Sequence, residues 1–228
     1  MREILAIIPA RGGSKSIKRK NIRLINGKPM VWYSIEACKN SKYITRFVVS
    51  TEDEEIKEIC EGFGAEVINR PIELAQDETK TAPVMVHSAL ELEKCGYKPN
   101  YITLIQPTSP FRTSEFIDKA FEFYFSQNGY DSCFSASEQG LTHGLWRGRD
   151  GKFDSLYDYR DRPRRQDLDK HYKIYCENGA FYTVKYEIFM RNQDFVGDNP
   201  CIFVSDFTFD IDEEKDLIKA EELMKAKI

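Results

Sequence analysis

The sequence lacks the features that mark membrane, secreted or nucleic-acid-binding proteins. No apolar run approaches the roughly 18 residues of a membrane-spanning helix. The apolar stretch Ile4–Ala10 leads directly into basic residues, which is the wrong order for a secretory signal peptide. The 33 basic and 37 acidic side chains give a net charge of −4, so no general attraction to nucleic acid or anionic membranes is expected. We therefore expect a cytoplasmic protein that binds neither.

The cysteines and histidines show no metal-binding or catalytic spacing. The six cysteines form no CxxC pair and no cysteine–histidine pair at zinc spacing, and the three histidines have no evident triad partner. A chain of 228 residues buries enough core to need no disulfides. We expect the cysteines to be mostly buried, reduced thiols.

The first two-thirds of the chain alternates short apolar runs with amphipathic segments. Buried strands are predicted at Glu3–Pro9, Arg46–Ser50, Ala65–Ile68, Tyr101–Gln106 and Asp131–Ser135. Helices are predicted at Pro29–Asn40, Asp53–Gly62, Thr81–Lys94 and Ser114–Gln127. This alternation favours right-handed crossovers and a three-layer α/β/α fold around a mostly parallel sheet. Ligands bind such sheets at the carboxyl ends of the strands, so the loops there are candidate site loops.

The pattern changes between about residues 139 and 175. Glycines, aromatic residues and dense charge replace the alternation, which indicates an inserted arm or lobe within a single domain spanning residues 1–228. The chain then returns to regular elements, with strands at Asn178–Val184 and Cys201–Val204 and helices at Lys185–Asn192 and Asp212–Ala226. Thr51 is the predicted cap of the helix at 53–62, and Thr113 or Ser114 that of the helix at 114–127.

The loop after the first strand, RGGSKSIKRKN at 11–21, combines glycines with cations. Gly12 and Gly13 can adopt positive φ and turn successive backbone N–H groups inward as an anion nest. The loop lacks the GKS or GKT ending of a Walker A motif and the GxGxxG pattern of a dinucleotide site. Its chemistry suits a triphosphate whose charge must be neutralised during transfer. A solvated basic turn is the alternative interpretation.

This loop resembles the signature segment of the CMP-N-acylneuraminate synthetases, the sialic-acid-activating cytidylyltransferases. Other segments resemble the family in the same order: VSTEDEEI (49–56), RPIELAQD (70–77), LIQPTSPFRT (104–113), ENGAFY (177–182) and DID (210–212). The resemblance covers essentially the whole chain and implies a nucleotidyltransferase-like fold. The related ketodeoxyoctonate synthetases fit less well, because their opening loop is richer in tyrosine and proline.

The resemblance implies transfer of CMP from CTP to the anomeric hydroxyl of a nine-carbon 2-keto sugar acid, with release of pyrophosphate. N-acetylneuraminate is the first candidate acid, and legionaminate, pseudaminate and deaminated neuraminate are alternatives. A catalytically silent nucleotide-binding module is the alternative outside enzymology. The family further implies Mg²⁺ or Mn²⁺ as cofactor and a homodimer in which the inserted lobe reaches the partner.

By this resemblance, the nucleotide is expected to contact Arg11, Gly13, Ser14, Lys15, Lys20, Asn21, Arg70 and Thr81. Lys20 is expected to stabilise the pentavalent transition state, with Arg11 and Lys15 as close competitors for that role. Two of the eight residues have structural alternatives. Arg70 could form a surface ion pair with Glu66 or Glu73, and Thr81 could cap the helix that it begins.

The sugar acid is expected to contact Gln106, Ser109, Arg165, Asn178 and Tyr182. An amide at the end of a strand, as Gln106 provides, can both donate to and accept from a sugar hydroxyl or acetamido group. Arg112, shortly after it, is placed to meet an anion. The alternatives are that PTSP is only a rigid turn and that Tyr182 only packs.

Asp210 and Asp212 flank Ile211, so an extended segment would direct both carboxylates to one face while Ile211 packs inward. Two carboxylates with phosphate oxygens suit Mg²⁺. We therefore predict that both aspartates bind the metal and that Asp210 is catalytic. The alternative is that Asp212 caps the helix that follows it.

Overall fold

The computed structural model describes residues 2–139, 145–156, 158, 160, 161, 164, 167, 173–206 and 209–226. The predicted sugar contact Arg165 lies outside these residues, as does part of the predicted insertion. Within the described part of the chain, no helix has the length and apolar character needed to cross a membrane.

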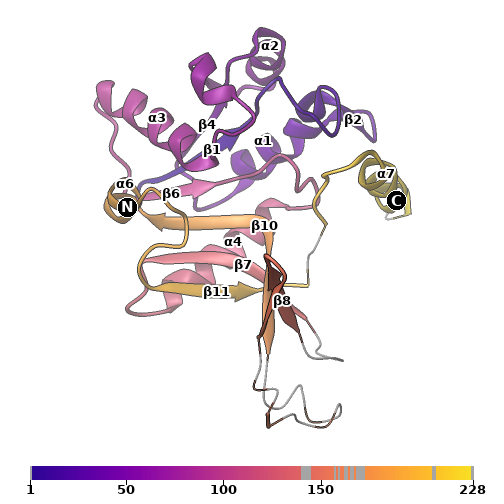
Figure 1. Cartoon of the computed structure of the whole chain (residues 1–228). Helices are drawn as coiled ribbons and strands as arrows, with labels where there is room; N and C mark the ends of the chain where they lie inside the picture. Colours follow the sequence, from indigo (N-terminus) through magenta and orange to yellow (C-terminus); the bar gives the residue numbers. More distant parts are fainter. Residues whose placement is uncertain are drawn as a thin grey trace.

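A seven-stranded sheet in the order β11-β7-β10-β6-β1-β4-β5 forms the centre of the protein (Figure 1). Its strands are β1 (Ile4–Pro9), β4 (Arg46–Thr51), β5 (Glu66–Asn69), β6 (Tyr101–Leu104), β7 (Ser132–Gln139), β10 (Ile174–Lys185) and β11 (Pro200–Val204). All neighbouring pairs are parallel except those of β10, which runs antiparallel to both β6 and β7. The mostly parallel sheet is therefore confirmed, with one reversed strand that the sequence pattern did not predict.

Helices cover both faces of the sheet, as the α/β/α prediction requires. They are α1 (Met30–Asn40), α2 (Glu54–Gly62), α3 (Thr81–Lys94), α4 (Ser114–Ser126) and α6 (Tyr186–Asn192). Further elements are α7 (Glu214–Ala226) and the short 3₁₀ turns η1 (Lys20–Ile22) and η2 (Ile72–Ala75). Because side chains alternate along a strand, Ile4, Ala6 and Ile8 of β1 pack with α1, α2 and α4, whereas Leu5 and Ile7 pack with α3 and α6. Burial on both faces explains why β1 is a continuous apolar run.

The helix caps correct one prediction and resolve another. Asp53, not Thr51, caps α2, because its carboxylate accepts a hydrogen bond of 3.0 Å from the backbone N–H of Ile56. Thr113 caps α4 by accepting from the N–H of Phe116 at 3.3 Å. The Asp53 carboxylate at the start of α2 also interacts favourably with the positive end of the helix dipole.

The strands on either side of the predicted insertion are longer than expected. β7 and β10 pair out to Gln139 and Ile174, with an irregularity in register between Glu177 and Tyr182. A hairpin of β8 (Trp146–Arg149) and β9 (Lys152–Ser155) then extends away from the sheet (Figure 1). Its surface exposes large apolar side chains, among them Trp146 and Phe153.

A third apolar cluster joins the two ends of the chain. Ile17 and Ile25 of the N-terminal region pack with Ile211 and with Leu217 of α7. Ile25 belongs to a small hairpin of β2 (Leu24–Ile25) and β3 (Lys28–Pro29). This cluster places the segment that contains Asp210 and Asp212 beside the basic loop.

Candidate active site

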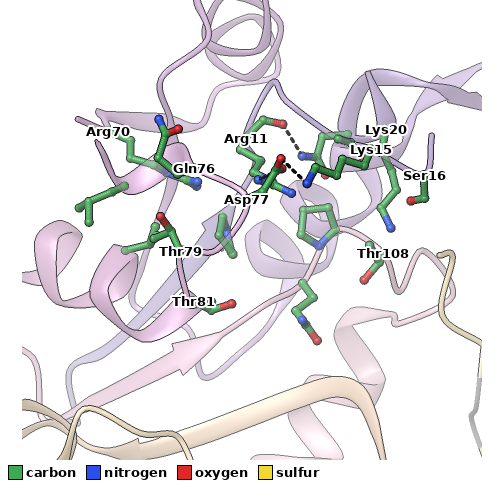
Figure 2. A pocket seen from close by; sticks show the side chains of 17 residues that line it. Arg11, Lys15, Ser16, Lys20, Arg70, Gln76, Asp77, Thr79, Thr81 and Thr108 are labelled. Carbon is green, nitrogen blue, oxygen red and sulfur yellow. Dashed lines mark hydrogen bonds and ion pairs between the residues drawn. The ribbon is translucent and has the colours of Figure 1, made fainter. Parts of the chain in front are cut away.

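A cavity of about 410 Å³ opens at the carboxyl ends of β1, β5 and β6 (Figure 2). Three segments line it: the basic loop after β1, the stretch from Arg70 to Val84, and residues 106–108 after β6. Every predicted nucleotide residue except Gly13 lines this cavity, and so does Gln106. The structure thus brings together residues that the sequence placed on separate loops.

The basic loop is shaped differently from the predicted anion nest. Neither Gly12 nor Gly13 has a positive φ, and the left-handed residue of the loop is Arg19, with φ of 59°. Gly12 is required for close approach instead: its N–H donates to Glu52 Oε1 at 2.7 Å, and a Cβ there would lie 2.9 Å from Cγ of Asp53. The positive-φ nest is therefore wrong, and the glycine allows the loop to lie against the end of β4.

Arg19 anchors this loop and does not serve the cavity. Its guanidinium forms a two-point ion pair with the Asp53 carboxylate and also contacts Glu55 at the start of α2. The hydrogen bonds from Arg19 hold the pKa of Asp53 below its usual range, and the same pair raises the pKa of Arg19. The left-handed backbone at Arg19 is thus accompanied by two carboxylate contacts.

Arg11 and Lys15 converge on a single carboxylate across the cavity. Asp77 Oδ1 lies 2.9 Å from Arg11 Nη1, and Asp77 Oδ2 lies 2.8 Å from Lys15 Nζ (Figure 2). The hydrogen bonds from Lys15 and then Arg11 lower the pKa of Asp77. Asn21 supports the arrangement from behind, because its side-chain N–H₂ donates to the Arg11 carbonyl at 2.9 Å.

Sequence reasoning assigned Asp77 no role, although the resemblance included its segment. It also assigned no role to Leu74, Gln76, Thr79 and Val84, which line the cavity as well. The available signal was position: these residues lie between Arg70 and the start of α3, in a loop at the ligand-binding edge of the sheet.

The alternative structural roles of Arg70 and Thr81, a surface ion pair and a helix cap, are not observed. Arg70 is only 6% exposed and donates to Ser50, through Nε to Oγ at 3.2 Å and through Nη2 to the carbonyl at 2.6 Å. Burial lowers its pKa to about 10, and the surface ion pair with Glu66 is absent because Glu66 pairs with Arg46. Thr81 is the first residue of α3 but makes no capping hydrogen bond. Both side chains are thus left to line the cavity.

Lys20 connects the basic loop to the C-terminal segment. Its Nζ donates to the Ile211 carbonyl at 2.7 Å and to Asp212 Oδ1 at 3.1 Å. The side chain is 13% exposed, so its charge lies in a largely enclosed position. Lys20 is therefore held between the cavity and the two predicted metal-binding carboxylates.

The two aspartates lie in different environments. Asp210 is half-buried, accepts from Ser109 Oγ at 3.4 Å, and has its pKa raised by burial. Asp212 is exposed, and Ile211 between them is fully buried, as predicted. The capping alternative for Asp212 is wrong: α7 starts at Glu214, and the Asp216 carboxylate accepts from the N–H groups of Asp212 and Glu213.

These carboxylates fit a hard divalent cation. Two carboxylates are a typical protein contribution to a Mg²⁺ site, which keeps several waters and takes its other ligands from phosphates. No cluster of three or more metal-binding side chains of the His, Cys, Asp or Glu type occurs among the described residues. A cation at Asp210 and Asp212 would therefore need substrate oxygens to complete its coordination.

A second cavity, of about 260 Å³, has Asp210 in its wall. It is lined by residues of β7 and β10 together with Asp210, and includes Asn178 and Gly179. Gly179 has φ of +71°, and a Cβ there would lie 3.0 Å from Gln106 Oε1 and 3.5 Å from Asp210 Oδ2. Gln106, Gly179 and Asp210 thus mark the boundary between the two cavities.

The predicted sugar residues differ in how they relate to these cavities. Asn178 lines the second cavity and is fixed by the serine hydroxyls of Ser135, at 2.5 Å, and Ser205, at 3.0 Å. Ser109 is fully buried behind Asp210. Tyr182 lines neither cavity; its hydroxyl donates to Glu177 Oε2 at 2.8 Å, and its ring packs on aromatic neighbours.

Arg112 does not meet an anion of the site directly, contrary to expectation. It is 2% exposed, and its Nη1 donates to the carbonyls of Gln106, at 3.0 Å, and Ala180, at 3.2 Å. Its Nη2 donates to Ser34 Oγ at 2.5 Å. Burial lowers its pKa to about 10. The guanidinium therefore ties the Gln106 loop to β10 and to α1.

Comparison with protein families decides the class of this site. Residues 5–226 match the cytidylyltransferase family. The chain belongs to this family. A cytidylyltransferase is a nucleotidyltransferase, and a cavity walled by arginine and lysine beside a carboxylate pair is consistent with that chemistry.

Three curated relatives span the chain at moderate identity. A Campylobacter coli post-translational flagellin modification protein B is 37% identical over all of this chain and 97% of its own length. A Campylobacter jejuni CMP-N,N'-diacetyllegionaminic acid synthase is 34% identical over all of this chain and 97% of its own. An Escherichia coli N-acylneuraminate cytidylyltransferase is 30% identical over 99% of this chain, which spans only 53% of that protein.

Solved structures support the fold of this cytidylyltransferase. A CMP:2-keto-3-deoxy-manno-octonic acid synthetase in complex with CTP superposes with a TM-score of 0.74. The alignment covers 99% of this chain and 100% of that one at 15% identity. At that identity the likeness shows the fold alone, and it confirms the nucleotidyltransferase-like architecture.

Proposed function

We propose that this cytidylyltransferase is a CMP-nonulosonate synthetase. It transfers CMP from CTP to the anomeric hydroxyl of a nine-carbon 2-keto sugar acid and releases pyrophosphate. The carrying observation is that Arg11, Lys15 and Lys20 line one cavity together with Gln106, and that Lys20 contacts Asp212 next to it. N-acetylneuraminate is the expected acid, with legionaminate, pseudaminate and deaminated neuraminate as alternatives. The names of the N-acylneuraminate and legionaminic acid relatives support this class.

The nucleotide is proposed to lie along the basic loop and the Arg70–Thr81 wall. Arg11, Lys15 and Lys20 would neutralise the triphosphate, with Ser14 and Asn21 as polar contacts. Because Lys20 is largely enclosed, its charge is less screened by water than that of Lys15, which is 76% exposed. Lys20 is therefore the residue we assign to charge that develops at the α-phosphate in the transition state.

A divalent cation, Mg²⁺ or Mn²⁺, is proposed to be held by Asp210 and Asp212 together with phosphate oxygens. When bound, it would supply charge neutralisation at the reacting phosphate. The chain's own contribution is orientation: Ser109 contacts Asp210 from behind, and Lys20 holds Asp212 through a 3.1 Å contact. Gly13 is proposed to act only by leaving space, since nothing lies within 4 Å of a Cβ built there.

The sugar acid is proposed to bind where the two cavities meet. Gln106 lines the first cavity, Asn178 lines the second together with Asp210, and Arg165 remains a predicted contact for the sugar. Ser109 and Tyr182, also predicted contacts, would contribute chiefly by holding Asp210 and Glu177. We further propose a cytoplasmic homodimer that contacts through the β8–β9 arm, whose exposed apolar side chains are unusual for a solvated hairpin.

Pyrophosphate release tests this function. The protein is incubated with CTP, Mg²⁺ and one acid from a panel of nine-carbon sugar acids, and each reactant is omitted in turn. Release that requires both CTP and one acid would support the synthetase and name its substrate. Binding of CTP without release for any acid would favour the silent binding module, and no binding of CTP would contradict the proposed nucleotide cavity.

A further inference from the structure

The carboxylate of Asp77 lies between two of the cations that the proposed function assigns to the triphosphate. Arg11 and Lys15 approach it from the basic loop, at 2.9 and 2.8 Å, and Figure 2 shows the three side chains close together. Arg11 Nη1 also donates to the Ala75 carbonyl at 3.4 Å, so the cation is held by the same stretch of chain. Two of the three lysine and arginine side chains proposed to bind triphosphate thus share one acid, Asp77, whereas the third, Lys20, pairs with Asp212.

A phosphate group cannot join this arrangement without a cost. A phosphate oxygen that bound the same guanidinium and ammonium groups would lie close to the Asp77 carboxylate, and like charges at such separations repel. Asp77 is exposed and lies in the loop between η2 and α3, so its side chain can turn into solvent. Binding of a phosphate group would therefore exchange one anion for another.

We infer that Asp77 is a specificity-determining residue that competes with the phosphate groups of the ligand for Arg11 and Lys15. A polyphosphate that contacts both cations replaces both ion pairs that Asp77 loses. An anion that contacts only one cation replaces only one of them and therefore binds less well. After transfer, pyrophosphate lacks the nucleoside that held it in the cavity, and the returning carboxylate favours its departure. This inference rests on the proposed function, because it takes the cavity to be the triphosphate site.

The test is the affinity of Asp77→Asn for Mg²⁺–pyrophosphate and Mg²⁺–CTP, measured by calorimetry without sugar acid. Removing the competing charge should tighten pyrophosphate binding about two- to fivefold, the range expected for an exposed ion pair. The gain should shrink as salt is raised, because exposed charges are screened. Asp77→Glu retains the charge and should bind both ligands as the unsubstituted protein does.

Glu78→Gln is the matched control, since it removes the same charge from the adjacent exposed residue. An equal gain in Glu78→Gln, or unchanged or weaker pyrophosphate binding in Asp77→Asn, would overturn the role of Asp77. If the unsubstituted protein binds CTP and Asp77→Asn shows no gain, only this inference fails. If the unsubstituted protein binds neither ligand, the proposed function fails with it.

Discussion

Replacing Gly179 by alanine would test whether Gln106 and Asp210 meet at the reacting end of the cavity. Gly179 has φ of +71°, a conformation that is unfavourable for alanine. Its Cβ would lie 3.0 Å from Gln106 Oε1 and 3.5 Å from Asp210 Oδ2. The substitution therefore adds one methyl group at the point where the two cavities join.

Two effects of different size are expected. The left-handed backbone should cost alanine about 1–2 kcal/mol of folding free energy, which lowers the thermal midpoint by roughly 2–8 °C in a chain of this size. The methyl group also forces the Gln106 amide to move by a few tenths of an ångström. If Gln106 positions the sugar acid, kcat/KM for that acid should fall by roughly tenfold, while the dissociation constant of CTP stays nearly unchanged.

Gly96→Ala is the matched control for the backbone cost. Gly96 has φ of +80°, lies just after α3, and has nothing within 4 Å of a Cβ built there. Both variants should lose similar stability in thermal unfolding, but only Gly179→Ala should lose sugar-acid kinetics in the pyrophosphate-release assay. Equal kinetics in the two variants would refute the placement of Gln106 at the sugar.

Three further substitutions have clear expected outcomes. Arg112→Met removes the Arg112 donor from the carbonyls of Gln106 and Ala180 and from Ser34 Oγ, and it should lower the free energy of unfolding by roughly 2–5 kcal/mol. Urea denaturation measures this, and a loss below about 1 kcal/mol would contradict the tie between Gln106 and β10. Asp210→Asn should raise the Mg²⁺ concentration needed for half-maximal activity, and an unchanged Mg²⁺ dependence would remove Asp210 from the metal site. Lys20→Ala should lower kcat far more than CTP affinity, whereas equal losses would indicate a contact made already in the ground state.

The elements predicted well from sequence are those whose boundaries have local causes. The helix Thr81–Lys94 was predicted with its observed bounds because its apolar spacing is helical and Gly96 follows it with positive φ. The strand at Glu3–Pro9 was found within one residue because burial on both faces demands a continuous apolar run. The bounds of both elements are therefore determined by residues that are close in the sequence.

The direction of β10 had no comparable local cause. An apolar segment reads the same whether it pairs parallel or antiparallel, and the insertion before β10 allows the chain to return from either end of the sheet. The same insertion concealed the true lengths of β7 and β10, whose outer residues pair with each other beyond the packed layers. Direction and length were therefore set by tertiary contacts.

The candidate site shows the same division. Cations in the loop after β1 were predictable because residue type and position sufficed. The partner of each long side chain was not predictable, because partners such as Arg11 and Asp77 lie 66 residues apart in the sequence. Arg112 illustrates the limit in another way: arginine is almost never fully buried, so nothing local indicates that its acceptors are carbonyls in the core.

The two ends of the chain meet where the metal site is proposed. Lys20 donates to the Ile211 carbonyl across 191 residues of sequence, and Ile211 packs with Ile17 in the cluster that seats α7. The position of the carboxylates therefore depends on how α7 packs against the basic loop, because Asp210 and Asp212 lie between β11 and α7 and belong to neither. A single apolar residue between two aspartates thus couples helix packing to the geometry of the proposed metal site.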